Sequence, residues 1–162
     1  MLSSFHVDAV DWQLGGEIEY AEIDIAGEEY HPMLAKWVVD AHLGMGFGVE
    51  AHYAVGVLDD TVANVAMEVS DYGALYASYR GYLYDSLILE ILYGRAEINL
   101  DSNLNNSGFP GGLRFRSDSY GISLQERLSI NQNVIVSAGY RQLFKDENMR
   151  ARVLSFGVNY AF

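Results

Sequence analysis

The carboxyl-terminal stretch Leu154-Ser155-Phe156-Gly157-Val158-Asn159-Tyr160-Ala161-Phe162 alternates strictly between large apolar residues and small or polar ones. Successive side chains of a β-strand point to opposite faces of the sheet. This alternation therefore predicts a strand with one apolar face and one polar face. The same pattern occurs seven more times toward the amino terminus, so the whole chain is organised by this period.

We predict eight amphipathic strands, at about residues 12–21, 35–45, 49–57, 74–83, 87–100, 120–128, 134–141 and 154–162. The fifth range is the least regular, because its charged residues Glu90 and Arg95 have opposite parity. Either Glu90 lies at the interfacial rim or a β-bulge resets the phase. We expect Leu92, Gly94, Ala96 and Ile98 to point outward, and Tyr93, Arg95, Glu97 and Asn99 to point inward.

The predicted connections alternate between short and long. The short ones are residues 44–48, 84–86 and 130–133, and the longer, polar ones are 24–32, 59–70, 101–117 and 145–149. Short turns at one end and longer loops at the other are typical of an up-and-down antiparallel meander. No linker interrupts the pattern, so we predict a single domain over residues 1–162.

The charged residues gather on one face of the predicted strands, opposite a nearly unbroken apolar face. This pattern favours a transmembrane barrel whose apolar exterior contacts lipid and whose polar groups line the lumen. Aromatic residues fall near strand ends, where membrane girdles belong: Trp12, Tyr20, Tyr53, Tyr120 and Tyr140. We predict an all-β, eight-stranded antiparallel up-and-down transmembrane β-barrel, apolar outside and polar inside. The alternative is a water-soluble β-barrel, because soluble antiparallel sheets also alternate.

Composition limits the possible partners and compartments. Asp and Glu number 22 against 10 Lys and Arg, for a net charge of −12, which disfavours nucleic acid as a partner. The absence of cysteine excludes a disulfide scaffold and a thiolate zinc site. No window approaches 18 apolar residues, and Met1 to Val10 do not resemble a signal peptide. If the protein is exported, we expect this chain to be a mature form.

Three stretches carry a resemblance to a known family. They are Phe156-Gly157-Val158-Asn159-Tyr160-Ala161-Phe162, Ser137-Ala138-Gly139-Tyr140-Arg141 and Leu92-Tyr93-Gly94-Arg95-Ala96. The chain resembles the OmpA-like and OmpX-like eight-stranded barrels, often called the porin family, of the outer membrane of Gram-negative bacteria. The resemblance implies periplasmic short turns and external long loops. It also implies an assembly signal, formed by Phe156, Val158, Tyr160 and Phe162, that the outer-membrane barrel insertion machinery reads.

Family activities are diverse, so function does not follow from the fold. The lipid A deacylases of such barrels carry a His and a Ser two residues apart on one strand, plus a carboxylate. The four histidines are His6, His31, His42 and His52, and the residues two positions later are Asp8, Met33, Gly44 and Ala54. A palmitoyltransferase would need His, Asp and Ser in the outer loops, where only His31 lies. We predict no catalytic residue and no cofactor, with a lipid A-modifying enzyme as the second alternative.

His42 and His52 are the only weak candidates for a metal site. A turn centred near Gly46 and Phe47 would place them opposite each other on neighbouring strands, both inward, close to Asp40 and Glu50. Two imidazoles and a carboxylate could bind zinc or relay a proton. Because the sequence offers no fixed third ligand, we expect the two histidines to belong to a hydrogen-bonded network in the lumen. We predict no metal.

The inward positions predict a lumen filled by opposite charges. Residues 1–79 hold 14 acidic residues and a single base, Lys36, whereas residues 80–162 hold 8 acidic and 9 basic residues. The predicted lumen charge network is Glu17, Glu19, Asp40, Glu50, Arg80, Arg95, Arg127 and Arg141. We expect these charges to pair as a plug, so that Arg95→Ala or Arg127→Ala destabilises the barrel. The alternative is a hydrated pore, which would make the protein a narrow channel for ions or small solutes.

A second set of charges is predicted at the outer rim. The third and fourth long loops carry Arg114, Arg116, Lys145, Arg150 and Arg152, whereas the first two are acidic. We expect an electrically two-sided rim whose basic side contacts the phosphates of lipopolysaccharide, with an ordinary solvated loop as the alternative. The expected role is structural or surface-interacting, with outer-membrane lipid and an unknown surface or complex partner.

Overall fold

The computed structural model describes residues 10–25, 27–62, 65–102, 112–146 and 149–162. Their strands are β1 (Asp11–Ile25), β2 (Glu28–Tyr30), β3 (Met33–Gly44), β4 (Phe47–Leu58), β5 (Asp60–Val62), β6 (Val65–Tyr82), β7 (Leu87–Ser102), β8 (Leu113–Leu128), β9 (Asn131–Lys145) and β10 (Met149–Ala161). Among these residues, no helix is long and apolar enough to cross a membrane.

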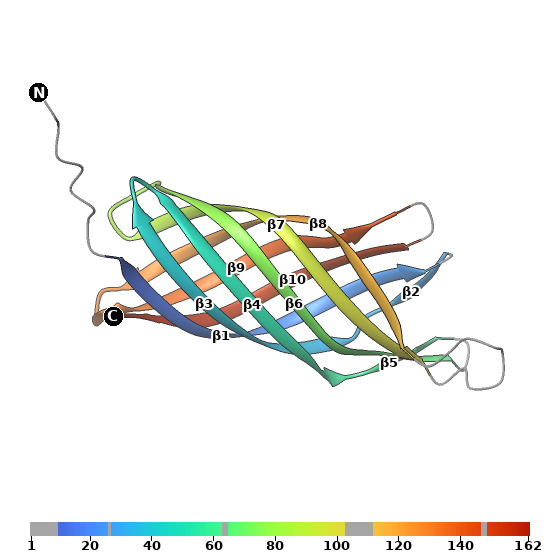
Figure 1. Ribbon diagram of the computed structural model, residues 1–162. Helices are drawn as coiled ribbons and strands as arrows, with labels where there is room; N and C mark the ends of the chain where they lie inside the picture. Colours follow the sequence, from blue (N-terminus) through green and yellow to red (C-terminus); the bar gives the residue numbers. More distant parts are fainter. Residues whose placement is uncertain (1–9, 26, 63–64, 103–111, 147–148) are drawn as a thin grey trace, which may run out of the picture.

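Eight long strands form one closed antiparallel barrel (Figure 1). Each long strand pairs with the long strands before and after it in sequence, and β1 pairs with β10 to close the barrel. The short strands β2 and β5 pair with the ends of β1 and β6 that lie toward the long loops. The prediction of an all-β, eight-stranded up-and-down barrel is confirmed.

The short turns, the start of β1 and the carboxyl terminus lie at one end, which we call the short-turn end (Figure 1). Between β3 and β4, Met45 and Gly46 have φ values of 54° and 86°. Positive φ at both central residues is typical of the two-residue hairpin turns that match strand twist. This turn pairs His42 with Gly48 and His52 with Val38, so the prediction that the two histidines lie opposite each other is wrong.

At the other end, the long-loop end, the strands continue into regions that the sequence assigns to loops. β6 begins at Val65, β8 at Leu113 and β10 at Met149. The predicted connections at 59–70, 101–117 and 145–149 are therefore partly barrel wall. The extra wall carries its own pattern of polarity, which is different from that of the rest of the barrel.

A band of apolar side chains surrounds the half of the barrel nearer the short turns. On β1 it runs from Trp12 to Tyr20, close to the 9–11 residues that a tilted strand needs to cross a bilayer. Exposed aromatic side chains mark its edge toward the long loops: Tyr20, Trp37, Tyr53, Tyr93, Tyr120 and Tyr140. A second set marks the other edge: Trp12, Phe47, Tyr79, Tyr84, Tyr160 and Phe162. We call the first set the upper aromatic belt.

Beyond the upper aromatic belt, the polarity of the wall is reversed. Outward positions there are charged: Glu22, Asp24, Arg95, Glu97, Arg114, Arg116, Asp118, Arg150 and Arg152. Inward positions form an apolar upper core: Ala21, Ile23, Leu34, Ala54, Met67, Val69, Tyr72, Ala96, Ile98, Leu100, Leu143, Phe144, Met149, Ala151 and Val153, joined by Tyr30 of β2. This arrangement is the one expected for a barrel wall in water, with apolar groups inside and charges outside.

The reversal explains the irregular parity of β7. Its pairing with β8 runs from Leu87 to Leu100 without a register shift, so no bulge resets the phase. Leu92, Ala96 and Ile98 point inward, and Tyr93 points outward. Arg95 also points outward, with 77% of its side chain exposed. The predicted orientation of this strand is therefore wrong, because Glu90 is in the polar lumen whereas Arg95 is beyond the apolar band.

Candidate functional site

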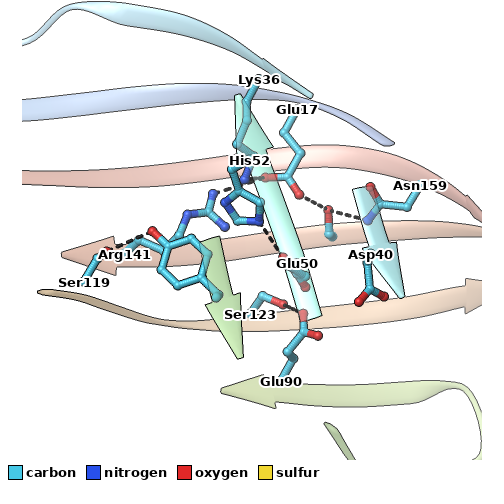
Figure 2. Close-up of polar contacts among 12 residues, drawn as sticks. Glu17, Lys36, Asp40, Glu50, His52, Glu90, Ser119, Ser123, Arg141 and Asn159 are labelled. Atoms are coloured by element: carbon cyan, nitrogen blue, oxygen red, sulfur yellow. Dashed lines mark hydrogen bonds and ion pairs between the residues drawn. The ribbon is translucent and has the colours of Figure 1, made fainter. Parts of the chain in front are cut away.

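Two clusters of buried charges fill the lumen inside the apolar band (Figure 2). The upper ionic cluster contains Glu17 and Glu19 of β1, Lys36 of β3 and Arg141 of β9. The lower ionic cluster contains Asp40 of β3, Glu50 of β4, Arg80 of β6 and Glu90 of β7. All these residues share the inward parity of their strands, so the alternation that exposes apolar groups to lipid also concentrates charge inside.

In the upper ionic cluster, two cations share two carboxylates. Lys36 Nζ forms ion pairs with Glu17 and, at 3.1 Å, with Glu19. Arg141 Nη2 lies 3.3 Å from Glu17 and 2.5 Å from Glu19. The hydroxyl of Tyr72 donates to Glu19 at 2.6 Å. The attraction between these paired charges offsets much of the free energy that their desolvation costs. Removal of one partner would leave an unpaired charge buried in the lumen, which is strongly destabilising.

In the lower ionic cluster, three carboxylates surround one guanidinium. Arg80 lies 2.5 Å from Asp40, 2.7 Å from Glu90 and 3.7 Å from Glu50. Two neutral side chains of β8 also bind the Glu90 carboxylate: Gln125 donates at 2.6 Å and Ser123 at 3.1 Å. The contacts of Arg80 and Glu90 thereby join five strands, β3, β4, β6, β7 and β8.

Little open space remains between the charged side chains. The void lined by residues of both clusters has a volume of about 10 Å³, room for about one water molecule. The upper core lies beyond it toward the long loops. Toward the short turns the lumen opens as a cup of about 150 Å³, lined by residues that include Asp11, His42 and Arg127. The described part of the lumen is thus filled by an ionic layer and an apolar layer.

Most of the predicted lumen residues lie in these clusters, but two do not. Glu17, Glu19, Asp40, Glu50, Arg80 and Arg141 are buried and paired. Arg127 is half-buried at the cup and forms no ion pair with the rest of the described chain. Arg95 is outside the barrel and pairs with Asp118 at 3.3 Å. The expected destabilisation by Arg95→Ala or Arg127→Ala therefore lacks a structural basis.

Lys36, Glu90 and Tyr72 belong to the network, although the sequence analysis did not include them. Lys36 has the parity of Asp40 on the same strand, and this was a signal for its inward position. Glu90 has the parity of Leu92, which belongs to the same inward face. Glu90 was missed because Arg95, which has the opposite parity, was assigned to the lumen, and Tyr72 was missed because only charged residues were assigned to the network.

The two histidines occupy different environments. His52 is buried, and its Nε2 atom shares a hydrogen bond of 2.5 Å with Glu50 Oε2. Its ring centroid lies 4.9 Å from that of Tyr76. His42 lines the cup at the short-turn end. Within the described residues, no group of three or more His, Cys, Asp or Glu side chains could hold a metal ion.

The predicted rim residues lie on strands rather than on loops. Arg114 and Arg116 of β8 both pair with Glu97 of β7. Arg150 and Arg152 of β10 pair with Asp24 and Glu22 of β1. Lys145 is exposed at the end of β9. Four of the five predicted basic residues are therefore paired with an acidic group of a neighbouring strand in the described wall, and the two-sided rim stays a prediction.

The terminal stripe lies on the outside of the apolar band. Phe156, Val158, Tyr160 and Phe162 are exposed by 51%, 52%, 42% and 71%, and all belong to the outward face at the end of the chain. The backbone amide of Phe162 donates to the carbonyl of Trp12 at 3.0 Å, which extends the β1–β10 closure to the last residue. These side chains are placed to contact lipid.

Comparison of the sequence with protein-family models and with curated proteins gives no match. Solved structures do match the fold. Ail, the attachment invasion locus protein of Yersinia pestis, in complex with the heparin analogue sucrose octasulfate, has a TM-score of 0.70 at 15% identity over 94% of this chain and 99% of that one. Neisserial surface protein A has a TM-score of 0.71 at 14% identity, over 93% and 97% of the two chains.

The N-terminal β-barrel domain of Pseudomonas aeruginosa OprF has a TM-score of 0.61 at 19% identity, over 91% of this chain and 97% of that domain. The three structures are small eight-stranded outer-membrane barrels. The chain therefore has the fold of that group, as its resemblance predicted.

Proposed function

We propose that the protein is an integral outer-membrane β-barrel that presents its long-loop end at the cell surface and has a structural or surface-interacting role. The observation that carries the proposal is the reversal of polarity at the upper aromatic belt. Below the belt, apolar side chains face outward and need lipid. Above it, charged side chains face outward and need water, while the apolar upper core faces inward.

This reversal supports a single orientation for the barrel in a membrane. The charged wall extends only beyond the long-loop side of the band, so that end projects furthest into an aqueous phase. We assign the short turns, which lie at the opposite end, to the periplasm, in line with the family resemblance. We assign the terminal stripe of Phe156, Val158, Tyr160 and Phe162 to recognition by the barrel insertion machinery during assembly.

The packed lumen favours a surface role over the two alternatives. A narrow channel needs a continuous wet path, whereas the void between the ionic clusters holds about one water molecule. A lipid A-modifying enzyme needs an accessible nucleophile beside a base. The lumen serines Ser123 and Ser137 instead donate to Glu90 and Glu17 and are buried.

A similar barrel offers a precedent for an anionic ligand. Ail is seen in complex with sucrose octasulfate, a heparin analogue. On this chain, exposed arginines of the upper wall supply donors for anionic groups. We include phosphorylated lipid or polysaccharide of the cell surface among the partners of the long-loop end.

Cysteine labelling tests the proposed orientation cleanly, because the chain contains no cysteine. Thr61 lies exposed on β5 at the long-loop end, and Ser129 lies exposed in a short turn. On intact bacteria, a membrane-impermeant maleimide should label the Thr61→Cys variant and leave the Ser129→Cys variant unlabelled until the outer membrane is permeabilised. The Ile122→Cys variant, within the apolar band, should stay shielded by lipid in both conditions. Labelling of Ser129→Cys on intact cells, or of neither end after permeabilisation, would contradict the proposal.

A further inference from the structure

A shallow groove lies on the outer face of the barrel, at the boundary between the apolar band and the charged wall. Its volume is about 420 Å³, and residues of β6, β7 and β8 line it. Gly73 and Leu75 form its apolar side, and Arg95, Glu97 and Arg116 form its polar side. A Cβ atom at Gly73 would meet no atom within 4 Å, so the space above this glycine is open.

The strand register continues the groove toward the apolar band. Outward pairs across β6 and β7 join Gly73 with Glu97, Leu75 with Arg95 and Ala77 with Tyr93. On the other side, Gly73 pairs with Tyr53 of β4. Gly73 and Ala77 are thus small outward residues beside the exposed rings of Tyr53 and Tyr93, with the exposed side chain of Leu75 between them. This surface leads from charged side chains to the lipid-facing band, where a hydrocarbon chain would pack against Leu75 and Ala77.

The polar side of the groove has a surplus of positive charge. Glu97 accepts hydrogen bonds from both Arg114 and Arg116, so two guanidinium groups share one carboxylate. Arg95 makes a single contact of 3.3 Å with Asp118, and its side chain remains 77% exposed. Asp71, one pair further from the band, accepts a hydrogen bond from Asn99 and does not line the groove. Arg95 and Arg116 both line the groove, and these contacts use only part of the five N–H donors of each guanidinium.

We propose that this groove binds lipid A, with a phosphate between Arg95 and Arg116 and an acyl chain along β6 over Gly73. Arginine binds phosphate through two parallel N–H donors, and the phosphate lies at the depth where the wall changes from apolar to charged. The choice of lipid A over other phosphorylated lipids rests on the proposed orientation, which puts this boundary in the outer leaflet. This inference rests on the proposed surface role and identifies lipid A as a ligand of the barrel.

The experiment measures lipid binding by the folded, detergent-purified protein with native mass spectrometry. The probes are lipid A, lipid A from which the phosphates have been removed, and phosphatidylglycerol. We expect lipid A to bind at one site at least about tenfold more tightly than either of the other lipids, because a charge-assisted bidentate contact is lost without the phosphates and only part of the acyl surface is present in the glycerolipid.

Two variants test the two halves of the groove. The double variant Arg95→Gln/Arg116→Gln should weaken lipid A binding about tenfold or more and abolish the preference for the phosphorylated form. Gly73→Leu should weaken all lipid binding at this site, because the new side chain fills the open space. Gly81→Leu is its matched control, since Gly81 lies on the same face of β6, also has no atom within 4 Å of a built Cβ, and is remote from the groove. Arg152→Gln is the control for loss of an outer-wall arginine elsewhere.

Binding of lipid A that is unchanged in Gly73→Leu or in the double arginine variant would overturn the site. Equal binding of phosphatidylglycerol would overturn the assignment to lipid A. Both results are independent of the cysteine-labelling test, because binding in detergent does not depend on which way the barrel faces in the cell.

Discussion

Replacing Arg141 with methionine should lower the free energy of unfolding by about 3–5 kcal/mol, the range for removing one partner of a buried ion pair. Arg141 is 2% exposed and contacts both Glu17 and Glu19. Without it, Lys36 alone faces two buried carboxylates. Methionine keeps most of the side-chain volume, so the decrease in the free energy of unfolding comes from the missing charge rather than from altered packing. The measurement is urea unfolding of the protein in detergent micelles, followed by tryptophan fluorescence.

Two other arginines provide matched controls for this prediction. Arg127→Met removes a half-buried inward arginine without an ion pair among the described residues, and Arg95→Met removes an exposed outward one. Each should change the stability by less than about 1 kcal/mol. In the double variant Arg141→Met/Glu19→Gln, part of the lost stability should return, because the unpaired negative charge is gone. An Arg141→Met barrel as stable as the Arg127→Met barrel would show that the upper ionic cluster does not contribute to stability.

Replacing Val69 with asparagine should destabilise the barrel by about 3 kcal/mol or more. Val69 is fully buried in the upper core, where an amide would lose its water without gaining partners. The substitution also removes the stabilisation from a buried apolar side chain, about 1.5 kcal/mol or more. The same urea unfolding assay measures the change.

The neighbouring residue gives the control. Glu68 lies next to Val69 on β6 and is exposed on the outer wall, so Glu68→Asn should change the stability by about 0.5 kcal/mol or less. If the long-loop end of the barrel were instead a hydrated vestibule, Val69→Asn would be as well tolerated as Glu68→Asn, and the idea of an apolar seal would be wrong.

The positions of the strands could be predicted because alternation is a local property. Each segment from Trp12 to Tyr20 or from Leu154 to Phe162 needs only its own residues to show an apolar and a polar face. Closure of the barrel followed from the number of strands and from connections that alternate in length. The same reasoning put Glu17, Asp40 and Arg141 in the lumen.

The orientation of β7 could not be predicted from alternation alone. Glu90 and Arg95 are both charged, and a rule that puts every charge inside requires a bulge between them. In the structure, the strand stays regular and the surroundings change, from lipid beside Ile91 to water beside Arg95. Where a strand leaves the bilayer depends on the tilt and stagger of the whole barrel, which one segment does not encode.

The partners within the lumen also depend on long-range register. Arg80 meets Asp40 across the intervening strand β4, and Arg141 meets Glu17 across β10. A turn at Met45 and Gly46, one position earlier than the sequence suggested, was enough to separate His42 from His52. Such contacts require the closed barrel, whereas the inward parity of each residue does not.

Single-channel recording in planar lipid bilayers shows whether the barrel is sealed. The protein should be purified, shown to be folded and compared with a mock preparation from cells that lack its gene, which controls for contaminating porins. We expect no conductance steps above those of the mock preparation, because the ionic clusters and the upper core fill successive sections of the lumen. Steady, discrete steps that appear only with the unmutated protein would contradict the seal and make the protein a channel.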